Sequence, residues 1–404
     1  MNKPLTFLCI SFYFKGGEFM QSCKQDGNTV YLLTSRKLEH RPWPREAIDE
    51  FFFMDNIENT PENIADITRG VAWLMREKKI DAIVALDDFD VEKAASIREE
   101  LRIPGMGLTT SRYFRDKLAM RMKADEAGIR VPRFTSLFHN DDINRFADDV
   151  PAPWLVKPRG EASATGIKKV HSKDELWSHI NALGDRRHQF LAEQFRPGDV
   201  YHSDSLIFNG DVAFCWSSKY LNTPYEIAHH AGIFRSATLD QNSAEAVRLR
   251  DLNAAVMKAF GMRHSASHTE FILSKDDGEF YFLETSSRVG GAHLSVLVET
   301  ASGINLWREW ARIESAVRRA EKWTLPEPRN DFAGILISLA RFEHPDTSVF
   351  DAPEITWRMN EKHHVGMVMR SESRDRIMEL LTTYADIVHR DFHASAPIGD
   401  KPSA

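Results

Sequence analysis

Two glutamates, Glu270 and Glu284, lie on the two arms of a predicted β-hairpin whose turn is Asp276-Asp277-Gly278. Directly paired residues of antiparallel strands point to the same face, with Cβ atoms roughly 4.5–5.5 Å apart. Two ionised carboxylates at that separation repel each other unless they share a proton or a cation lies between them. Oxygen ligands of this kind suit Mg²⁺, which combines one or two carboxylates with phosphate oxygens and water. The hairpin therefore predicts a magnesium–phosphate site, and the alternative is a shared proton or a pair of solvent-facing acids.

The pairing of these glutamates depends on the length of the hairpin loop. A two-residue loop would place Asp276 opposite Glu279, which is an unfavourable pair of like charges. A three-residue loop places Lys275 opposite Glu279 instead, so we expect the three-residue loop. In that register Glu270 faces Glu284 directly.

Further residues with useful chemistry follow the second glutamate closely. Ser286 and Arg288 lie two and four positions after Glu284, so in an extended chain their side chains continue the same face. The planar guanidinium of Arg288 suits a phosphate or a developing oxyanion. Gly290 and Gly291 allow a ligand to come close to the backbone. We expect all four residues to border the cavity that the hairpin glutamates face.

Two lysines could supply the positive charge that a polyphosphate needs. Lys157 ends the apolar segment Leu155-Val156-Lys157 and precedes a loop rich in small residues, whose backbone amides could close over an anion. The loop is not a Walker A motif, because the lysine comes before it rather than after it. Lys117 lies on the helix before this segment. Each lysine taken alone is equally compatible with an ordinary surface position.

The elements that must position these residues fall into three regions. Up to about residue 111, strand-like and helix-like stretches alternate, which favours a parallel sheet with crossover helices. The acids Asp87, Asp88 and Asp90 follow the last of these strands, where open α/β sheets bind ligands, although helix capping is the alternative. Hairpin signals and helices are mixed from 112 to 324. The remainder combines strands, an amphipathic helix and a polar tail.

The composition excludes several classes of protein. A chain of 404 residues with a net charge of −7 suggests two or three domains and has no basic footprint for nucleic acid. Its three cysteines are scattered, which excludes a disulfide framework or a cysteine-based zinc site. No stretch approaches the roughly 20 apolar residues of a membrane span. We expect a cytoplasmic enzyme that binds neither nucleic acid nor membrane, and the sequence is compatible with a homodimer.

The order of these residues resembles the ATP-grasp superfamily over roughly residues 112 to 313. The resemblance is carried by Lys117, Lys157 with its loop, Leu191-Ala192-Glu193-Gln194-Phe195, Glu270, and Glu284-Thr285-Ser286-Ser287-Arg288. It implies an α/β protein with an N-terminal parallel-sheet domain before the grasp (1–111). An α+β ATP-grasp domain follows (112–324) with a mobile lid at about 131–192, and a small C-terminal α+β domain with a disordered tail completes the chain (325–404).

The resemblance also implies roles for the matched residues in nucleotide binding. Lys117 and Lys157 would bind the α- and β-phosphates of ATP, with Ser163 in the loop that closes over them. Glu193 and the backbone through Phe195 would contact the adenine.

For the reacting groups, the resemblance implies that Glu270, Glu284 and Ser286 hold Mg²⁺ or Mn²⁺. Arg288 would stabilise the transferring phosphate or the acyl intermediate, and Gly290 and Gly291 would border the second substrate. His230 could accept a proton from the attacking amine, unless its segment is an ordinary surface loop.

Two departures from the family pattern concern these roles. Ser286 stands where the family usually has asparagine, so we expect a weakened metal ligand. The glutamate that usually binds the ribose is missing, and Asp199 could replace it from one position earlier.

The activity implied is that of an ATP-dependent, ADP-forming carboxylate–amine ligase for amino acids or other small acids. A substrate carboxylate attacks the γ-phosphate to give an acylphosphate, and an amine then displaces phosphate to give an amide or peptide bond. One alternative is a carboxylase-like or purine-pathway enzyme that activates bicarbonate or formate. Another is a nucleotide-binding regulatory module without catalysis.

Overall fold

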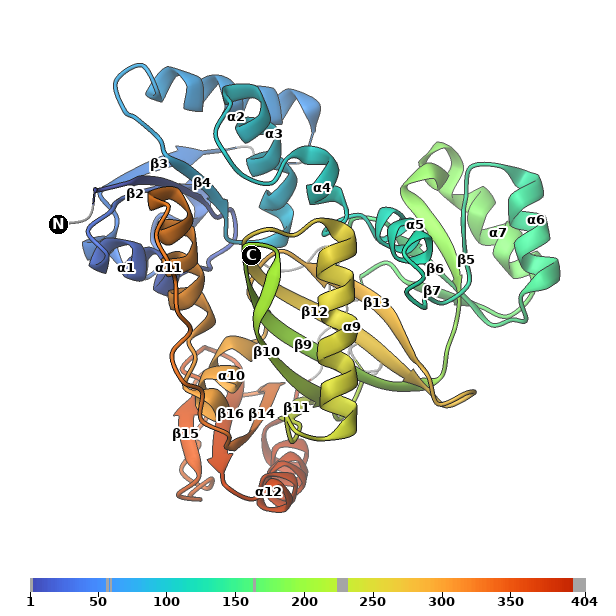
Figure 1. Cartoon of the computed structure of the whole chain (residues 1–404). Helices are drawn as coiled ribbons and strands as arrows, with labels where there is room; N and C mark the ends of the chain where they lie inside the picture. Colours follow the sequence, from blue (N-terminus) through green and yellow to red (C-terminus); the bar gives the residue numbers. More distant parts are fainter. Residues whose placement is uncertain (1–2, 56–57, 59, 163–164, 224–231, 395–404) are drawn as a thin grey trace.

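The computed structural model describes residues 3–55, 58, 60–162, 165–223 and 232–394 (Figure 1). The described chain builds three sheets, two of four strands and one of eight. Ser163, His230 and the expected disordered tail from 395 onward lie outside the described residues. No helix within the described ranges is long and apolar enough to cross a membrane.

The N-terminal sheet is parallel throughout, with the strand order β3-β2-β1-β4, as predicted. Its strands are β1 (Thr6–Ile10), β2 (Thr29–Ser35), β3 (Glu50–Met54) and β4 (Ala82–Ala85). The helices of this region are α1 (Gly17–Gln25), α2 (Pro61–Leu74), α3 (Val91–Leu101) and α4 (Leu108–Arg112). Both faces of the sheet are covered, because Phe7 packs with α1 whereas Leu8 packs with α2 and α3.

A small antiparallel sheet with the order β5-β8-β6-β7 lies to one side of the molecule (Figure 1). It consists of β5 (Phe134–Ser136), β6 (Trp154–Pro158), β7 (Lys168–Val170) and β8 (Phe190–Gln194), with α6 (Asn140–Asp149) and α7 (Lys173–Leu183). The unit has its own apolar core around Ile143, Trp154 and Leu176. Its span matches the segment expected to be a lid, whose motion stays a prediction.

The large sheet is antiparallel and has the order β13-β12-β9-β10-β11-β14-β16-β15. Its strands are β9 (Gly198–Phe208), β10 (Asp211–Tyr220), β11 (Phe234–Thr238), β12 (Ser265–Ser274), β13 (Phe280–Ser286), β14 (Phe332–Leu339), β15 (Ile355–Arg358) and β16 (His364–Ser371). Because β11 pairs with β14, the strands after residue 325 extend this same sheet. The three-domain division of the sequence stays a prediction.

Helices cover both faces of the large sheet near the hairpin. They are α5 (Lys117–Glu126), α9 (Ala244–Phe260), α10 (Leu294–Ser302), α11 (Leu306–Arg319) and, beside the C-terminal strands, α12 (Arg374–Ile387). Short 3-10 turns occur at Arg36–Leu38, Arg45–Ala47, Asp88–Asp90 and Gly184–Gln189, and a π turn at Val388–Phe392. Helix α11 also contacts the N-terminal sheet region, where the Asn28 amide donates to Ser315 Oγ at 3.0 Å. The N-terminal sheet is thereby joined to the body of the protein.

Candidate active site

The hairpin of β12 and β13 places Glu270 directly opposite Glu284, as predicted. The predicted three-residue loop is wrong, however. The Ser274 amide donates to the carbonyl of Glu279, which leaves four residues in the turn. The reason is a β-bulge: Phe271 pairs with Phe282, so one extra residue lies on β13 between the glutamate pair and the loop. The bulge shifts the loop end by one residue and leaves the glutamate pair in register.

The two glutamates of the pair have different partners. Glu284 Oε2 lies 2.9 Å from Lys117 Nζ, at the first residue of α5. Burial opposes ionisation of Glu284, but the charge of Lys117 outweighs it and holds the pKa of the carboxyl below its ordinary value. Glu270 Oε1 accepts a hydrogen bond from the Tyr220 hydroxyl at 2.9 Å. A shared proton is therefore disfavoured, because Glu284 is held as a carboxylate.

A buried chain of polar side chains supports Glu270 from behind. His268 Nε2 lies 3.5 Å from Glu270 Oε1, and His268 Nδ1 lies 2.9 Å from Asp204 Oδ1. The other oxygen of Asp204 contacts His202 Nδ1 at 2.7 Å, and His202 Nε2 reaches Ser236 Oγ at 2.8 Å. Burial opposes a charge on His268, but Asp204 raises its pKa to about 10.

The three ring and carboxylate groups lie close enough together to hold a cation. The hydrogen-bond distances between them account for the arrangement without one. Sequence reasoning missed this cluster. Its signal was alternation, because His202 and Asp204 share one face of β9, and His268 lies opposite Asp204 on β12.

The phosphate-side residues form a closed group of charges. The carboxylate of Glu193 contacts Lys157 Nζ through one oxygen and Arg121 through the other, at 3.0 Å from Nε and 2.9 Å from Nη2. Burial opposes ionisation of Glu193, but Arg121 and Lys157 lower its pKa. Its carboxylate is therefore already engaged by two cations, and the amide of Phe195 bonds to the carbonyl of Pro153. Adenine contact by these two residues stays a prediction.

Arg288 joins the hairpin to the N-terminal sheet. Its guanidinium forms an ion pair with Asp88, in the turn that follows β4, and donates to the carbonyl of Val289 at 2.7 Å. Burial opposes ionisation of Asp88, but Arg288 holds its pKa below the ordinary value. Of the three acids after this strand, Asp87 caps the turn and Asp90 binds the Phe12 amide. Only Asp88 of these three reaches the cavity.

A cavity of about 420 Å³ collects six of the eleven predicted site residues that the structure describes. Its wall includes these six: Lys117, Glu270, Glu284, Ser286, Arg288 and Gly291. The remaining described predictions, Lys157, Glu193, Phe195, Asp199 and Gly290, are not on this wall. Asp199 instead pairs with Lys219 at 2.7 Å, so its predicted ribose contact would require breaking that pair.

Position 290 requires glycine for a structural reason that the sequence did not suggest. A Cβ atom at this position would lie 2.7 Å from Asp204 Oδ1 and 3.0 Å from His268 Nδ1. Glycine therefore allows the backbone to pass over the buried Asp204–His268 pair. Gly291, by contrast, lines the cavity.

Three polar atoms near the cavity are buried without a hydrogen-bond partner among the described residues. They are Asp88 Oδ1, Ser286 Oγ and Arg288 Nε. Buried polar groups normally have partners, so a cluster of unsatisfied ones on a cavity wall points to a ligand that completes them. Asp88 Oδ1 and Ser286 Oγ can accept hydrogen bonds, and Arg288 Nε can donate one. Together they suit a ligand that carries both a positive and a negative group.

Comparison with known proteins finds amino-acid ligases among the relatives, although no family model matches the chain. The L-arginine-specific L-amino acid ligase of Bacillus subtilis is 25% identical over 299 residues, which cover 72% of this chain and 70% of the relative. The D-alanine–D-alanine ligase of Neisseria meningitidis is 26% identical over 208 residues, covering 50% of this chain and 68% of the relative.

Solved structures show the same fold over nearly the whole length. The L-amino acid ligase from Bacillus licheniformis has a TM-score of 0.72 at 18% identity and covers 97% of this chain and 98% of its own. The N5-carboxyaminoimidazole synthetase from Staphylococcus aureus, complexed with ADP, has a TM-score of 0.71 at 14% identity, with 95% and 98% covered. The chain is thus similar in sequence to amino-acid ligases and shares its fold with an L-amino acid ligase, which agrees with the resemblance to carboxylate–amine ligases of the ATP-grasp superfamily.

Proposed function

We propose that the protein is an ATP- and Mg²⁺-dependent ligase that couples the carboxylate of one amino acid to the amine of another and forms ADP and phosphate. The observation that carries this proposal is the pairing of Glu270 with Glu284 on the wall of a cavity that also holds Lys117 and Arg288. Carboxylates for a divalent cation and basic groups for phosphates are the combination that phosphoryl transfer needs.

The residues present fit a divalent cation. Glu270 and Glu284 supply carboxylate oxygens from paired positions, and the buried hydroxyl of Ser286 has no hydrogen-bond partner among the residues that the structure describes. This donor set contains only oxygen, which suits Mg²⁺ or Mn²⁺. A cation bound there would draw charge from the phosphate oxygens of ATP as the γ-phosphate is transferred.

The chain's own residues account for the positioning of the phosphates and of the first substrate. Lys117 at the N-terminus of α5 faces the cavity, and Lys157 adds a second positive charge once its contact with Glu193 is exchanged for a phosphate. Attack of a substrate carboxylate on the γ-phosphate then breaks the bond to the bridging oxygen and gives an acylphosphate and ADP. Arg288 Nε, which bonds to no other group within the described ranges, is available to the negative charge that develops as the amine attacks the acylphosphate.

Amino acids are the substrates that these groups favour. Asp88 lines the cavity, and its buried Oδ1 has no hydrogen-bond partner in the described part of the chain, so it can accept an α-ammonium group. Arg288 beside it can hold a carboxylate. The names of the relatives, an L-arginine-specific L-amino acid ligase and D-alanine–D-alanine ligases, agree with this substrate class.

The proposal is tested by incubating the protein with ATP, Mg²⁺ and mixtures of amino acids, and measuring phosphate release and the masses of the products. We expect phosphate release that depends on amino acids, together with dipeptides. Glu284→Gln should abolish both, whereas Glu279→Gln, on the same hairpin but outside the cavity, should change neither. ATP hydrolysis that bicarbonate stimulates, without any amide product, would reject the proposal in favour of a carboxylase-like enzyme.

A further inference from the structure

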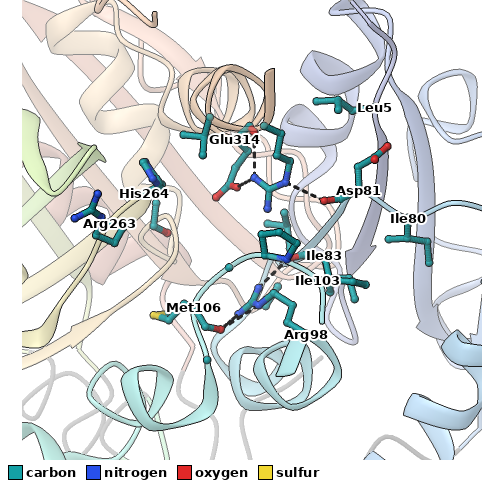
Figure 2. Close-up of a pocket in the computed structure, with 18 of the residues that line it drawn as sticks. Leu5, Ile80, Asp81, Ile83, Arg98, Ile103, Met106, Arg263, His264 and Glu314 are labelled. Carbon is teal, nitrogen blue, oxygen red and sulfur yellow. Dashed lines mark hydrogen bonds and ion pairs between the residues drawn. The ribbon is translucent and has the colours of Figure 1, made fainter. Parts of the chain in front are cut away.

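A second and larger cavity lies between the N-terminal sheet and the body of the protein (Figure 2). Its volume is about 1120 Å³, and it shares no lining residue with the reaction cavity. The walls come from β4, the segment between α3 and α4, the start of β12 and helix α11. Two parts of the chain that are far apart in sequence therefore enclose it.

The charge of this cavity is opposite to that of the whole protein. Seven Lys and Arg residues line it against three Asp and Glu residues, although the chain as a whole carries −7. Two of the acids are already paired, Glu314 with Arg318 and Asp81 with Lys79. Positive charge is therefore in excess on these walls, which favours an anion inside them.

Arg98 concentrates this excess on one side of the cavity. Its side chain is buried, and its guanidinium donates to the carbonyl of Ile83 at 2.8 Å and to that of Met106 at 3.0 and 2.8 Å (Figure 2). Within the described ranges, no carboxylate forms an ion pair with it. Burial lowers the pKa of Arg98 to about 10, which leaves it charged at neutral pH. A buried charge without a counter-charge is costly, so an anion at this position would stabilise it.

The loop over Arg98 is built closely around its side chain. Gly105 has φ +153°, and a Cβ atom there would lie 2.6 Å from Arg98 Cδ. This positive φ favours glycine, and the contact leaves no room for a side chain. The hydrogen bonds to Ile83 and Met106 hold the guanidinium of Arg98 at the cavity wall, and Gly105 leaves room for its side chain.

Apolar side chains make up much of the remaining wall. They include Leu5, Ile80, Ile83, Ile103, Met106 and Trp310. Ligand sites commonly combine such a lining with a few charged groups that fix orientation. We propose that this cavity binds a small organic anion, a phosphate or a carboxylate on an apolar body, at a site separate from the reaction cavity.

The two sites lie back to back on one strand end. Ser287 lines the larger cavity, whereas its neighbours Ser286 and Arg288 line the reaction cavity, because alternate residues of an extended segment face opposite sides. The carbonyl of Ser287 is fixed by the Ser265 hydroxyl at 3.1 Å. Because the cavities are separate, a ligand of one does not have to displace a ligand of the other. Anion binding can therefore be measured while the reaction cavity is occupied.

The test is calorimetric titration of the full chain with phenyl phosphate and with phenylacetate, and with uncharged phenylacetamide as the matched control probe. The titrations are done with Mg²⁺ and a non-hydrolysable ATP analogue present, so that the reaction cavity is filled. We expect saturable binding of at least one anion and none of the amide. Preference for phenyl phosphate or for phenylacetate then identifies the anionic group.

Two exposed arginines of the cavity rim allow a test that does not depend on buried residues. The double variant Arg102→Gln/Arg263→Gln should weaken anion binding at least fivefold, and Arg250→Gln, an exposed arginine of α9 outside the cavity, should leave it unchanged. Arg98→Gln should remove binding, with thermal unfolding measured in parallel because Arg98 also ties Ile83 to Met106. Three outcomes would each overturn the proposal: phenylacetamide binding as tightly as the anions, an unchanged anion affinity in the double variant, or loss of anion binding when the ATP analogue is present.

Discussion

Two clusters of charge lie near each other around α5, and they are built differently. Glu193 has both carboxylate oxygens in contact with cations, Arg121 and Lys157, and its side chain is almost fully buried. Glu284 has one close cation, Lys117, and about a third of its side chain remains exposed. The Glu193 carboxylate is therefore fully engaged within the protein, whereas Glu284 leaves ligand positions open beside a second carboxylate.

The difference separates a carboxylate that holds the fold, Glu193, from a carboxylate that can meet a ligand, Glu284. A buried ion pair is satisfied within the protein, and removing one partner leaves the other uncompensated. A group whose partners are incomplete, as with Ser286 Oγ and Arg288 Nε, keeps its capacity for a ligand. Substitution of Glu193 should therefore mainly lower the stability of the fold, whereas substitution of Glu284 should mainly weaken ligand binding.

The largest effect on stability is expected from Glu193→Gln. The substitution leaves Arg121 and Lys157 buried beside an uncharged group, which should lower the free energy of unfolding by about 3–5 kcal/mol. Glu284→Gln should lower it by less than about 1 kcal/mol, because that side chain is partly solvated and its removal also relieves the repulsion from Glu270. Urea unfolding of the two variants measures both values, and equal losses would erase the distinction between the clusters.

The neighbouring glycines provide the next comparison. Gly290→Ala should destabilise the fold by about 1–3 kcal/mol, because the new methyl group meets Asp204 and His268. Gly291→Ala should be tolerated in stability, since the nearest atom to its Cβ position is Arg288 Nη1 at 3.9 Å. Thermal unfolding of both variants tests this order. A larger loss of stability for Gly291→Ala than for Gly290→Ala would show that the Asp204–His268 pair does not need Gly290.

The last effect depends on pH and concerns Asp90, a further acid within a closed cluster. Burial raises its pKa to about 6, despite the nearby Lys93. A raised carboxyl pKa contributes stability below the unfolded value of about 3.9, and that contribution is lost as the pH rises through about 6.

Asp90→Asn should remove this pH dependence while keeping an acceptor for the Phe12 amide. The free energy of unfolding, measured in steps between pH 4 and 7, should therefore fall less steeply in the variant, by about 2 kcal/mol over the range. Parallel curves for wild type and variant would show that Asp90 does not titrate in this window.

The sequence predicted those features that depend on local patterns. The parallel N-terminal sheet followed from apolar stretches such as that of β1 alternating with helices. The pairing of Glu270 with Glu284 followed from alternation along two neighbouring strands. The predicted loop register was wrong because the extra residue of a β-bulge leaves no clear sign in the pattern of apolar residues.

Features that depend on distant residues were missed. His268 and Asp204 are 64 residues apart and meet only because β12 pairs with β9. The contact of Lys157 with Glu193 likewise arises from the pairing of β6 with β8, so the sequence alone could not show that these charges neutralise each other. The ion pair of Arg288 with Asp88 joins two sheets, and no pattern within either one predicts it.

The central claim is that Glu270 and Glu284 together hold a divalent cation beside the phosphates. Binding of Mn²⁺ measured by electron paramagnetic resonance, with the non-hydrolysable ATP analogue present, tests it most directly. We predict that Glu270→Gln and Glu284→Gln each weaken Mn²⁺ binding by roughly 100-fold or more, while Glu279→Gln binds as the wild type does. Unchanged Mn²⁺ affinity in both cavity variants, with the fold intact, would contradict the account.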